Sequence, residues 1–218
     1  LYMALKQHDF IEIRYTGRLA ENNKVFDTTD KDVAKKEGLP DAAAEGPIVI
    51  RLGEGQLLKG LEDQLVGKEL GTHKVILEPE HAFGKKIASK LQIIPTKKFI
   101  EQKIMPEPGV QISMDGVLGT VRSAGGGRTI VDFNHPLAGK AVVYDVNVTR
   151  IVTDAKEKVV AMVHRVLGVK ECAVDIDEKD GSATVALPNA DKLPDGTAKM
   201  LADQLASLTG VSNVTIVA

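Results

Sequence analysis

The stretch IRLGEGQLLKGLEDQLVG, residues 50–67, decides how the chain folds. It begins as the end of a strand, IVIRLG, which stops at Gly53. Four leucines then recur at helical spacing, namely Leu57, Leu58, Leu61 and Leu65. Gly67 marks the end of that run. The spacing predicts one short amphipathic helix over residues 57–65, set between segments that read as strands.

Strand patterns lie on both sides of this helix. Apolar and polar residues alternate in DFIEIRYTGRL (9–19) and in AGKAVVYDVNVTRIV (138–152), and shorter strand patterns occur in KVFDTTD (24–30) and THKVILEPE (72–80). Residues 30–46 are polar and rich in alanine and glycine, so we expect a loop there with at most one helical turn. The order predicts an α+β protein that is mainly β.

Residues 86–129 have a different character. Short apolar pieces such as LQIIP, VQISM and VLGTV stand between proline and glycine breaks, and only KKFIEQ carries a helix signal. We expect a small β-rich subdomain. Its apolar side chains are Ile93, Ile94, Phe99, Ile104, Met105, Val110, Ile112, Met114, Val117 and Leu118. A unit this small cannot bury all of them, so we expect some to pack and some to form an exposed patch.

The last segment, residues 155–218, predicts a third part. EKVVAMVHRVLG and DGTAKMLADQLASLTG read as helices, and ECAVDID, SATVALP and VSNVTIVA read as strands. RVLGVKECAVDI and ASLTGVSNVTIV form a faint repeat, each running from a helix end through Gly-Val into a strand. We expect a small α+β domain with helices on one face of an antiparallel sheet. A second copy could cover the edge of so small a sheet, which predicts a homodimer through residues 155–218.

Composition excludes several functions. The net charge is -2 without acidic or basic blocks, so neither nucleic acid nor an anionic membrane is an expected partner. The start, LYMALKQHDF, has no apolar run that would make a signal peptide, and no segment reaches the length of a membrane span. A single cysteine, Cys172, rules out a disulfide framework within one chain and fits a reducing cytoplasm. The histidines show no ligand spacing, so we expect no metal and no cofactor.

Four ordered motifs carry a resemblance. KVFDTT, IRLGEGQLLKGLEDQLVGKELG, ILEPEHAFG and FNHPLAGKAVVYDVNV together resemble the FKBP class of peptidyl-prolyl cis-trans isomerases, within the SlyD-like branch and its long archaeal members. The resemblance implies a bent antiparallel half-barrel wrapped around one short helix. It also implies a domain plan of an isomerase core (1–85 and 130–154), a chaperone insert in the flap (86–129) and the C-terminal domain (155–218).

The resemblance implies a prolyl-binding cup. The implied lining residues are Tyr15, Phe26, Ile48, Leu57, Leu58, Leu61, Phe83 and Tyr144. Asp27 is the one acid at the rim, and the backbone N–H of Leu58 is the expected donor to a substrate carbonyl. Leu61 replaces the tryptophan that many members carry, and Phe83 replaces a tyrosine whose hydroxyl binds substrate. We therefore expect weaker binding of substrate and of macrolide inhibitors. In the insert, the implied client-binding residues are Ile93, Ile94, Phe99, Met105 and Met114.

Taken singly, each of these residues is more typical of the hydrophobic core than of a binding site. Their order along the chain, with Asp27 between an aromatic residue and two threonines, favours the site. His135 in FNHPLAGK has no required role, because rotation about a prolyl bond moves no proton for a general base. The Asn-His-Pro-Leu-Ala-Gly run instead predicts a turn that leads into a strand.

The leading hypothesis is an isomerase with chaperone activity that acts on unfolded, proline-containing polypeptides. A second hypothesis is a client-holding chaperone whose cup has lost useful turnover. A third is an interaction scaffold whose functional part is the C-terminal domain.

Overall fold

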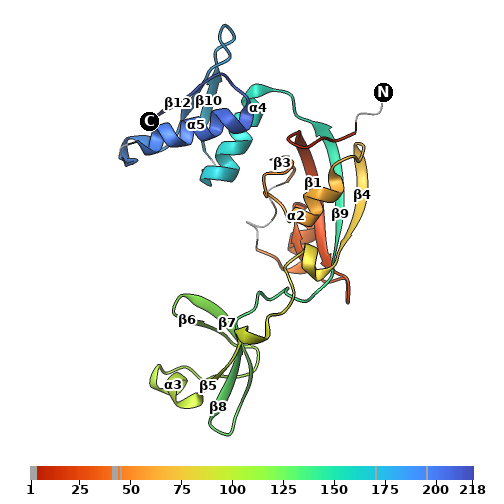
Figure 1. The fold of residues 1–218 in the computed structure, drawn as a ribbon, viewed down its shortest axis with the longest axis vertical. Coiled ribbons are helices and arrows are strands. Elements are labelled where there is room, and N and C mark those ends of the chain that lie inside the picture. The colour runs from red at the N-terminus through yellow and green to blue at the C-terminus, as the bar shows by residue number, and fades with distance from the viewer. Residues whose placement is uncertain (1–3, 41–43, 45, 170, 195) are drawn as a thin grey trace. The chain divides into compact units, whose positions relative to one another are not determined.

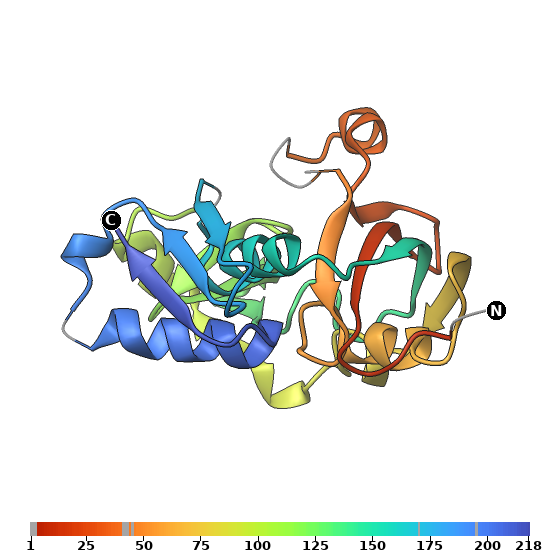
Figure 2. The ribbon, with the colours of Figure 1, turned by 90° about the horizontal axis from the view of Figure 1, so that it is seen from above.

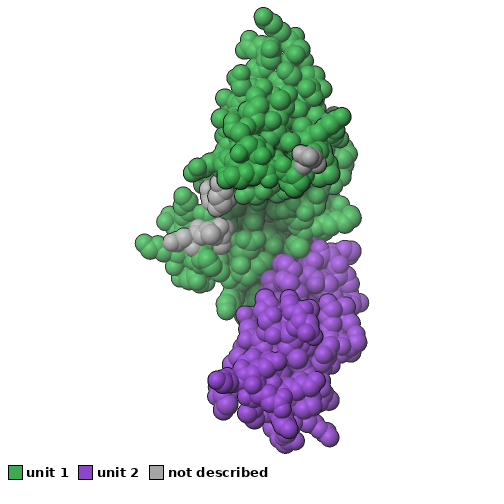
Figure 3. Space-filling view, turned by 90° about the vertical axis from the view of Figure 1, so that its left-hand side faces the viewer, with its two compact units in different colours: residues 1–76, 143–218 green, residues 77–142 purple. Residues whose placement is uncertain are grey.

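The computed structural model describes residues 4–40, 44, 46–169, 171–194 and 196–218. The chain divides into two compact units, which Figure 3 shows in different colours. The first joins Leu1–Ile76 to Val143–Ala218, and the second is Leu77–Val142. Most of the regular structure is strand, so the predicted α+β, mainly β class is confirmed.

One five-stranded sheet organises the part of the first unit outside the C-terminal domain (Figure 1). Its strands are β1 (Phe10–Leu19), β2 (Val25–Thr28), β3 (Ile48–Arg51), β4 (Gly71–Leu77) and β9 (Val142–Ile151). The order is β2-β1-β9-β4, and β3 also pairs with β1. Ten-residue β1 can hold two short antiparallel partners on different parts of its length: β3 pairs with Phe10–Ile13 and β2 with Thr16–Arg18.

The predicted short helix is present as α2 (Lys59–Leu65) and lies against this sheet (Figures 1 and 2). Leu61 and Leu65 are fully buried, which explains the helical spacing of the leucines. The helix starts two residues later than the predicted range of 57–65. Leu58 is extended, with φ -57° and ψ 130°, and the side chain of Glu62 binds the backbone N–H of Leu57. That bond holds the segment before α2 out of the helix.

The polar segment after β2 forms more helix than the sequence pattern predicts. Helix α1 (Lys31–Glu37) has the side chain of Asp30 as its N-cap, accepting from the backbone N–H groups of Asp32 and Val33. Gly38 closes it with a left-handed φ of 68°. The two caps were visible in the sequence, and they outweigh the low apolar content that favoured a loop.

The second unit contains the predicted β-rich insert. Its antiparallel sheet has the order β5-β8-β7-β6, formed by Leu91–Pro95, Arg128–Asp132, Val117–Gly125 and Gln111–Met114. The helix signal in KKFIEQ is α3 (Thr96–Glu101), and two 3-10 turns precede β5, at Pro79–His81 and Ala88–Lys90. Its buried core is Ile94, Phe99, Ile112, Val121 and Val131. Strand β8 ends at Asp132, so the sheet includes residues beyond the predicted segment 86–129.

The C-terminal domain has the predicted three strands and two helices. They are α4 (Ala155–Met162), β10 (Ala173–Ile176), β11 (Ala183–Ala186), α5 (Thr197–Thr209) and β12 (Val214–Val217). A π-helical turn at Val163–Leu167 continues α4, a 3-10 turn at Ala190–Lys192 follows β11, and α5 runs alongside β12 (Figure 2).

The expectation of a wholly antiparallel C-terminal sheet is wrong. β10 and β11 are antiparallel, but β12 pairs with β11 in parallel. The reason is the connection, because α5 lies between β11 and β12 and carries the chain back to the start of the sheet, as a parallel pair requires. The Gly-Val repeat is real: Gly168 and Gly210 both take left-handed φ values, 66° and 77°, where the helical segments end.

Candidate active site

Three aromatic side chains meet on neighbouring strands of the five-stranded sheet. The ring centroids of Tyr15 and Tyr144 are 5.8 Å apart and tilted by 59°. Phe26 approaches Tyr144 edge-on, with centroids 5.8 Å apart at 88°. Gly17 makes room for this arrangement, because a Cβ there would lie 2.9 Å from Phe26 Cζ and 2.9 Å from Tyr144 Cε1. The structure thus brings together the three predicted aromatic residues of the first unit.

Asp27 is tied directly to this cluster. The Tyr15 hydroxyl donates a hydrogen bond to Asp27 Oδ2 at 3.1 Å. Burial raises the pKa of Asp27 above its ordinary value, while the bond from Tyr15, a bond from the Thr28 backbone and the positive charge of Arg165 oppose the rise. Burial and the charge of Asp27 also raise the pKa of Tyr15 and of Tyr144, so both phenols keep their protons at neutral pH. The result is an apolar cup with one carboxylate and two phenol donors.

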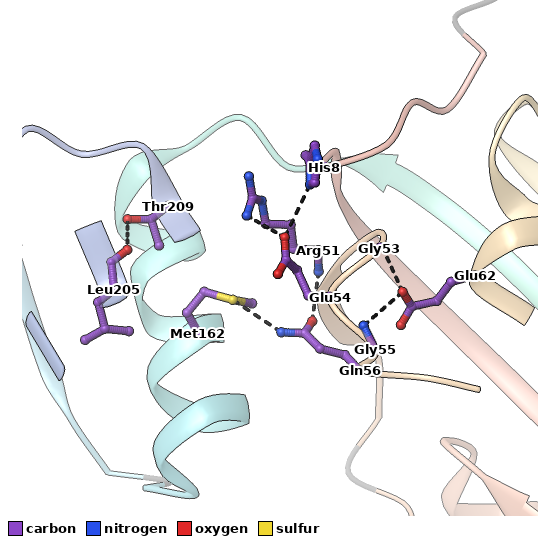
Figure 4. Close-up of polar contacts among 10 residues, drawn as sticks. All are labelled: His8, Arg51, Gly53, Glu54, Gly55, Gln56, Glu62, Met162, Leu205 and Thr209. Atoms are coloured by element: carbon purple, nitrogen blue, oxygen red, sulfur yellow. Dashed lines mark hydrogen bonds and ion pairs between the residues drawn. The ribbon is translucent and has the colours of Figure 1, made fainter. Parts of the chain in front are cut away.

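Glu62 is a functional residue that the sequence analysis missed. Its side chain is almost fully buried on α2 and accepts three backbone N–H groups. Oε2 accepts from Gly53 at 2.7 Å and from Gly55 at 3.2 Å, and Oε1 accepts from Leu57 at 2.7 Å (Figure 4 shows the two glycine contacts). The available signal was an acid between Leu61 and Leu65 on the apolar face of the helix. Glu62 fixes the loop that leads to Leu58.

The loop and helix place the other predicted cup residues. Leu61 is fully buried, Ile48 at the start of β3 is nearly so, and Leu57 and Leu58 are half-buried. The Leu58 carbonyl accepts from the backbone N–H groups of Leu61 and Glu62. The Leu58 N–H itself makes no hydrogen bond within the described part of the chain. It is therefore available as a donor to a substrate.

Phe83 belongs to the second compact unit, and its place in the cup stays a prediction. Within that unit its ring stacks on His135, with centroids 4.7 Å apart and planes 3° apart. His135 Nδ1 accepts from the backbone N–H of Leu137 at 3.1 Å. Nearby, Asn134 hydrogen-bonds both the N–H and the C=O of Ile87. The predicted turn at FNHPLAGK is confirmed.

The predicted client-binding residues of the insert divide into two groups. Ile93 and Met105 are exposed, by 65% and 73% respectively. Ile94 and Phe99 are buried in the core of the insert, and Met114 packs partly against that core. The buried pair supports the fold of the insert and offers a client little surface. Further exposed apolar side chains occur at Ile100, Val117 and Leu118.

Two features of the described residues bear on metal binding and on membrane-spanning helices. In the described residues, no three His, Cys, Asp or Glu side chains are grouped so that they could hold a metal ion. None of the described helices is long and apolar enough to cross a bilayer. Cys172 is partly buried, and burial raises the pKa of its thiol.

Known proteins show similarity over most of the chain. Residues 2–104 match a family model described as FKBP-type peptidyl-prolyl cis-trans isomerase, and residues 92–137 match one described as FKBP26, IF domain. A short-type peptidyl-prolyl cis-trans isomerase of Methanocaldococcus jannaschii is 30% identical over 66% of this chain and 92% of its own length.

Two bacterial proteins extend this similarity. The FKBP-type 16 kDa peptidyl-prolyl cis-trans isomerase of Escherichia coli K12 is 37% identical over 48% of this chain and 74% of its own length. The FKBP-type peptidyl-prolyl cis-trans isomerase SlyD of Helicobacter pylori is 26% identical over 73% of this chain and 85% of its own length. The two family models together span residues 2–137, which include Tyr15, Phe26, Asp27 and the insert.

Proposed function

The chain belongs to the FKBP-type peptidyl-prolyl cis-trans isomerase family and is such an isomerase, and on that premise we propose that it accelerates X-Pro isomerisation in unfolded polypeptide clients that its insert holds. The observation that carries this proposal is the cup of Tyr15, Phe26 and Tyr144 around the half-buried Asp27. No cofactor is needed, because no bond is made or broken.

The cup acts through its polarity. Rotation about an amide costs about 18–20 kcal/mol because resonance is lost. The planar amide carries more separated charge than the twisted one, so an apolar, water-poor cup disfavours the planar state. The Leu58 N–H is free to bind a substrate carbonyl, and the ionised Asp27 contributes an electrostatic field beside the rotating group. Both act without a proton transfer.

The insert supplies the holding site. Ile93 and Met105 are large and exposed, and the flexible side chain of Met105 can adapt to irregular apolar segments. A client bound there raises the local concentration of its prolines at the cup. The C-terminal domain, residues 155–218, is proposed as the dimer contact, and the lone Cys172 supports a cytoplasmic setting.

The test is refolding of a protein substrate whose slow phase is limited by proline isomerisation. The full chain should accelerate that phase, and Asp27→Ala should lose most of the acceleration. Asp63→Ala is the matched control, because Asp63 is an exposed acid whose partner is Lys59 on the same helix. No acceleration, with aggregation still suppressed, would favour the alternative of a client-holding chaperone. Removing residues 155–218 without loss of either activity would weaken the scaffold hypothesis.

A further inference from the structure

The C-terminal domain packs directly on the isomerase part of the same compact unit. The backbone N–H of Val152 donates to the carbonyl of Phe10 at 2.7 Å, and the Phe10 ring lies in the buried core of the C-terminal domain. Gln56 Nε2 donates to Met162 Sδ at 3.3 Å (Figure 4). Gln56 directly precedes Leu57 and Leu58, so helix α4 is joined to the loop that carries the expected substrate donor.

A cavity of about 840 Å³ opens where these two parts meet. One wall is Pro47, Ile48 and Val49 of the isomerase part, and Ile48 is also a predicted residue of the cup. The opposite wall is one face of α4 and the π-helical turn, which includes Val160, Ala161 and Arg165. The volume is within the range of ordinary ligand sites, and the shared residue Ile48 links its lining to the cup. An extended peptide in the cup could therefore continue into this cavity.

The acidic side chains that line the cavity have partners within the described part of the chain, whereas Lys156 and Arg165 do not. Asp154 accepts the backbone N–H of Glu157 as the N-cap of α4, and the Glu157 carboxylate is paired with Arg150 at 2.7 Å. Lys156 and Arg165 have no hydrogen bond or ion pair among the described residues. The acids are thus engaged within the chain, and the exposed positive charges are left for a ligand.

Arg165 is a basic residue of the cavity whose charge acts on the cup. It also lines a second cavity of about 420 Å³ with Gly55 and Gln56, at the loop that Glu62 fixes. Its positive charge reaches both Asp27 and Tyr15, lowering the pKa of each against the larger effect of burial. It stands in the π-helical turn Val163–Leu167, a rare geometry that is frequent at functional sites.

Resting on the proposed function, we propose that the C-terminal domain forms one wall of the substrate site, in which Arg165, aided by Lys156, binds an acidic side chain of the client close to the isomerising proline. Arg165 is a specificity-determining residue, because the rotating amide itself lies at Asp27 and Leu58. The clients favoured are proline-containing segments with aspartate or glutamate beside the proline.

The test compares short Ala-Pro peptides that differ only in a flanking glutamate, glutamine or lysine, with kcat/KM measured by NMR exchange on the full chain. At low salt the glutamate peptide should be turned over about three- to fivefold faster than the glutamine peptide, the size of an exposed ion pair, and the lysine peptide more slowly. About 1 M salt should remove these differences. Arg165→Gln should reduce the ratio of the glutamate rate to the glutamine rate to about one.

Lys199→Gln is the matched control, since Lys199 is an exposed basic residue of the same domain on α5 and should leave the preference intact. Equal rates for the glutamate and glutamine peptides in the unaltered protein would overturn this inference alone, with the isomerase still active. Equal slowing of all three peptides by Arg165→Gln would also overturn it, because that indicates a structural role. Failure to accelerate any peptide would remove the proposed function and this inference with it.

Discussion

The hydroxyl of Tyr15 donates to Asp27 at 3.1 Å, which joins the one acid of the cup to its aromatic wall. Tyr15 and Asp27 lie on adjacent strands, β1 and β2, whose register pairs Gly17 with Asp27. A register shift between Gly17 and Arg18 follows directly. The bond therefore depends on strand pairing that only the folded sheet provides.

Tyr15→Phe should lower kcat/KM by about three- to tenfold, which corresponds to the roughly 1 kcal/mol of one ordinary hydrogen bond. It should also raise the pKa of Asp27 further, because the bond from Tyr15 favours the ionised carboxylate. The Asp27 carboxyl carbon can be titrated by NMR in both proteins. Tyr144→Phe is the comparison, since its hydroxyl makes no hydrogen bond with the described residues. An equal titration shift in both variants would contradict this prediction.

Isomerase activity should fall on the acid side at a pH above the ordinary carboxyl value of 3.8, because burial raises the pKa of Asp27. The raised pKa of Asp27 affects folding stability in the opposite direction, because it favours the folded state at low pH. A raised pKa in the folded state means that the contribution of Asp27 is fully present below 3.8 and is lost as pH rises through the folded value. Asp27→Asn should abolish the acid limb of the kcat/KM profile, measured between roughly pH 4 and 8. A profile that is flat in the unaltered protein would show that ionisation of Asp27 is irrelevant.

Glu62→Ala should destabilise the first unit by about 2–4 kcal/mol, since three buried backbone N–H groups lose a charged acceptor. Urea unfolding followed by circular dichroism measures this loss. Activity should fall more than the folded fraction does, because the loop before Leu58 loses its position. Glu69→Gln, an exposed acid on the turn after α2, is the control. Native stability in Glu62→Ala would mean that water replaces the carboxylate at no cost.

Gly17→Ala should cost about 1–3 kcal/mol and reduce activity, because the new methyl group would overlap the rings of Phe26 and Tyr144. Gly125→Ala is the matched change, at a strand glycine where a Cβ meets nothing within 4 Å. Thermal unfolding and the refolding assay should separate the two variants. Normal activity in Gly17→Ala would show that the aromatic cluster is not the working surface.

The insert should lose stability in acid. Asp132 is buried and accepts from Asn134 and Arg122, and these bonds outweigh burial and lower its pKa to about 2. The pKa of Asp132 in the folded state is below the ordinary 3.8. Its contribution to the free energy of unfolding is therefore present above pH 3.8 and is lost as pH falls through about 2. NMR signals of Phe99 and Val131 should therefore broaden first in this range, and Asp132→Asn should lose the dependence. Asp191→Asn, a change at an exposed site, should leave the acid dependence of these NMR signals unchanged.

The succession of strands along the chain and helix α2 could be predicted from the sequence, because apolar spacing reports burial directly. It did not reveal Glu62, since an acid on a helix is ordinarily solvated and its three partners lie in a preceding loop. The parallel pairing of β12 also escaped prediction, because the alternation pattern of a strand does not encode its direction. Likewise, nothing in the sequence singled out Arg165, because the packing of α4 on β3 creates the cavity that it lines with Ile48.

The packing of Phe10 into the C-terminal core has a consequence for how the protein is made. Val152 and the helices that cover Phe10 emerge from the ribosome long after the first strand does. The isomerase part thus cannot bury Phe10 of its first strand while translation is still in progress. Until the last helix is released, the nascent enzyme presents an uncovered aromatic side chain and resembles one of its own clients.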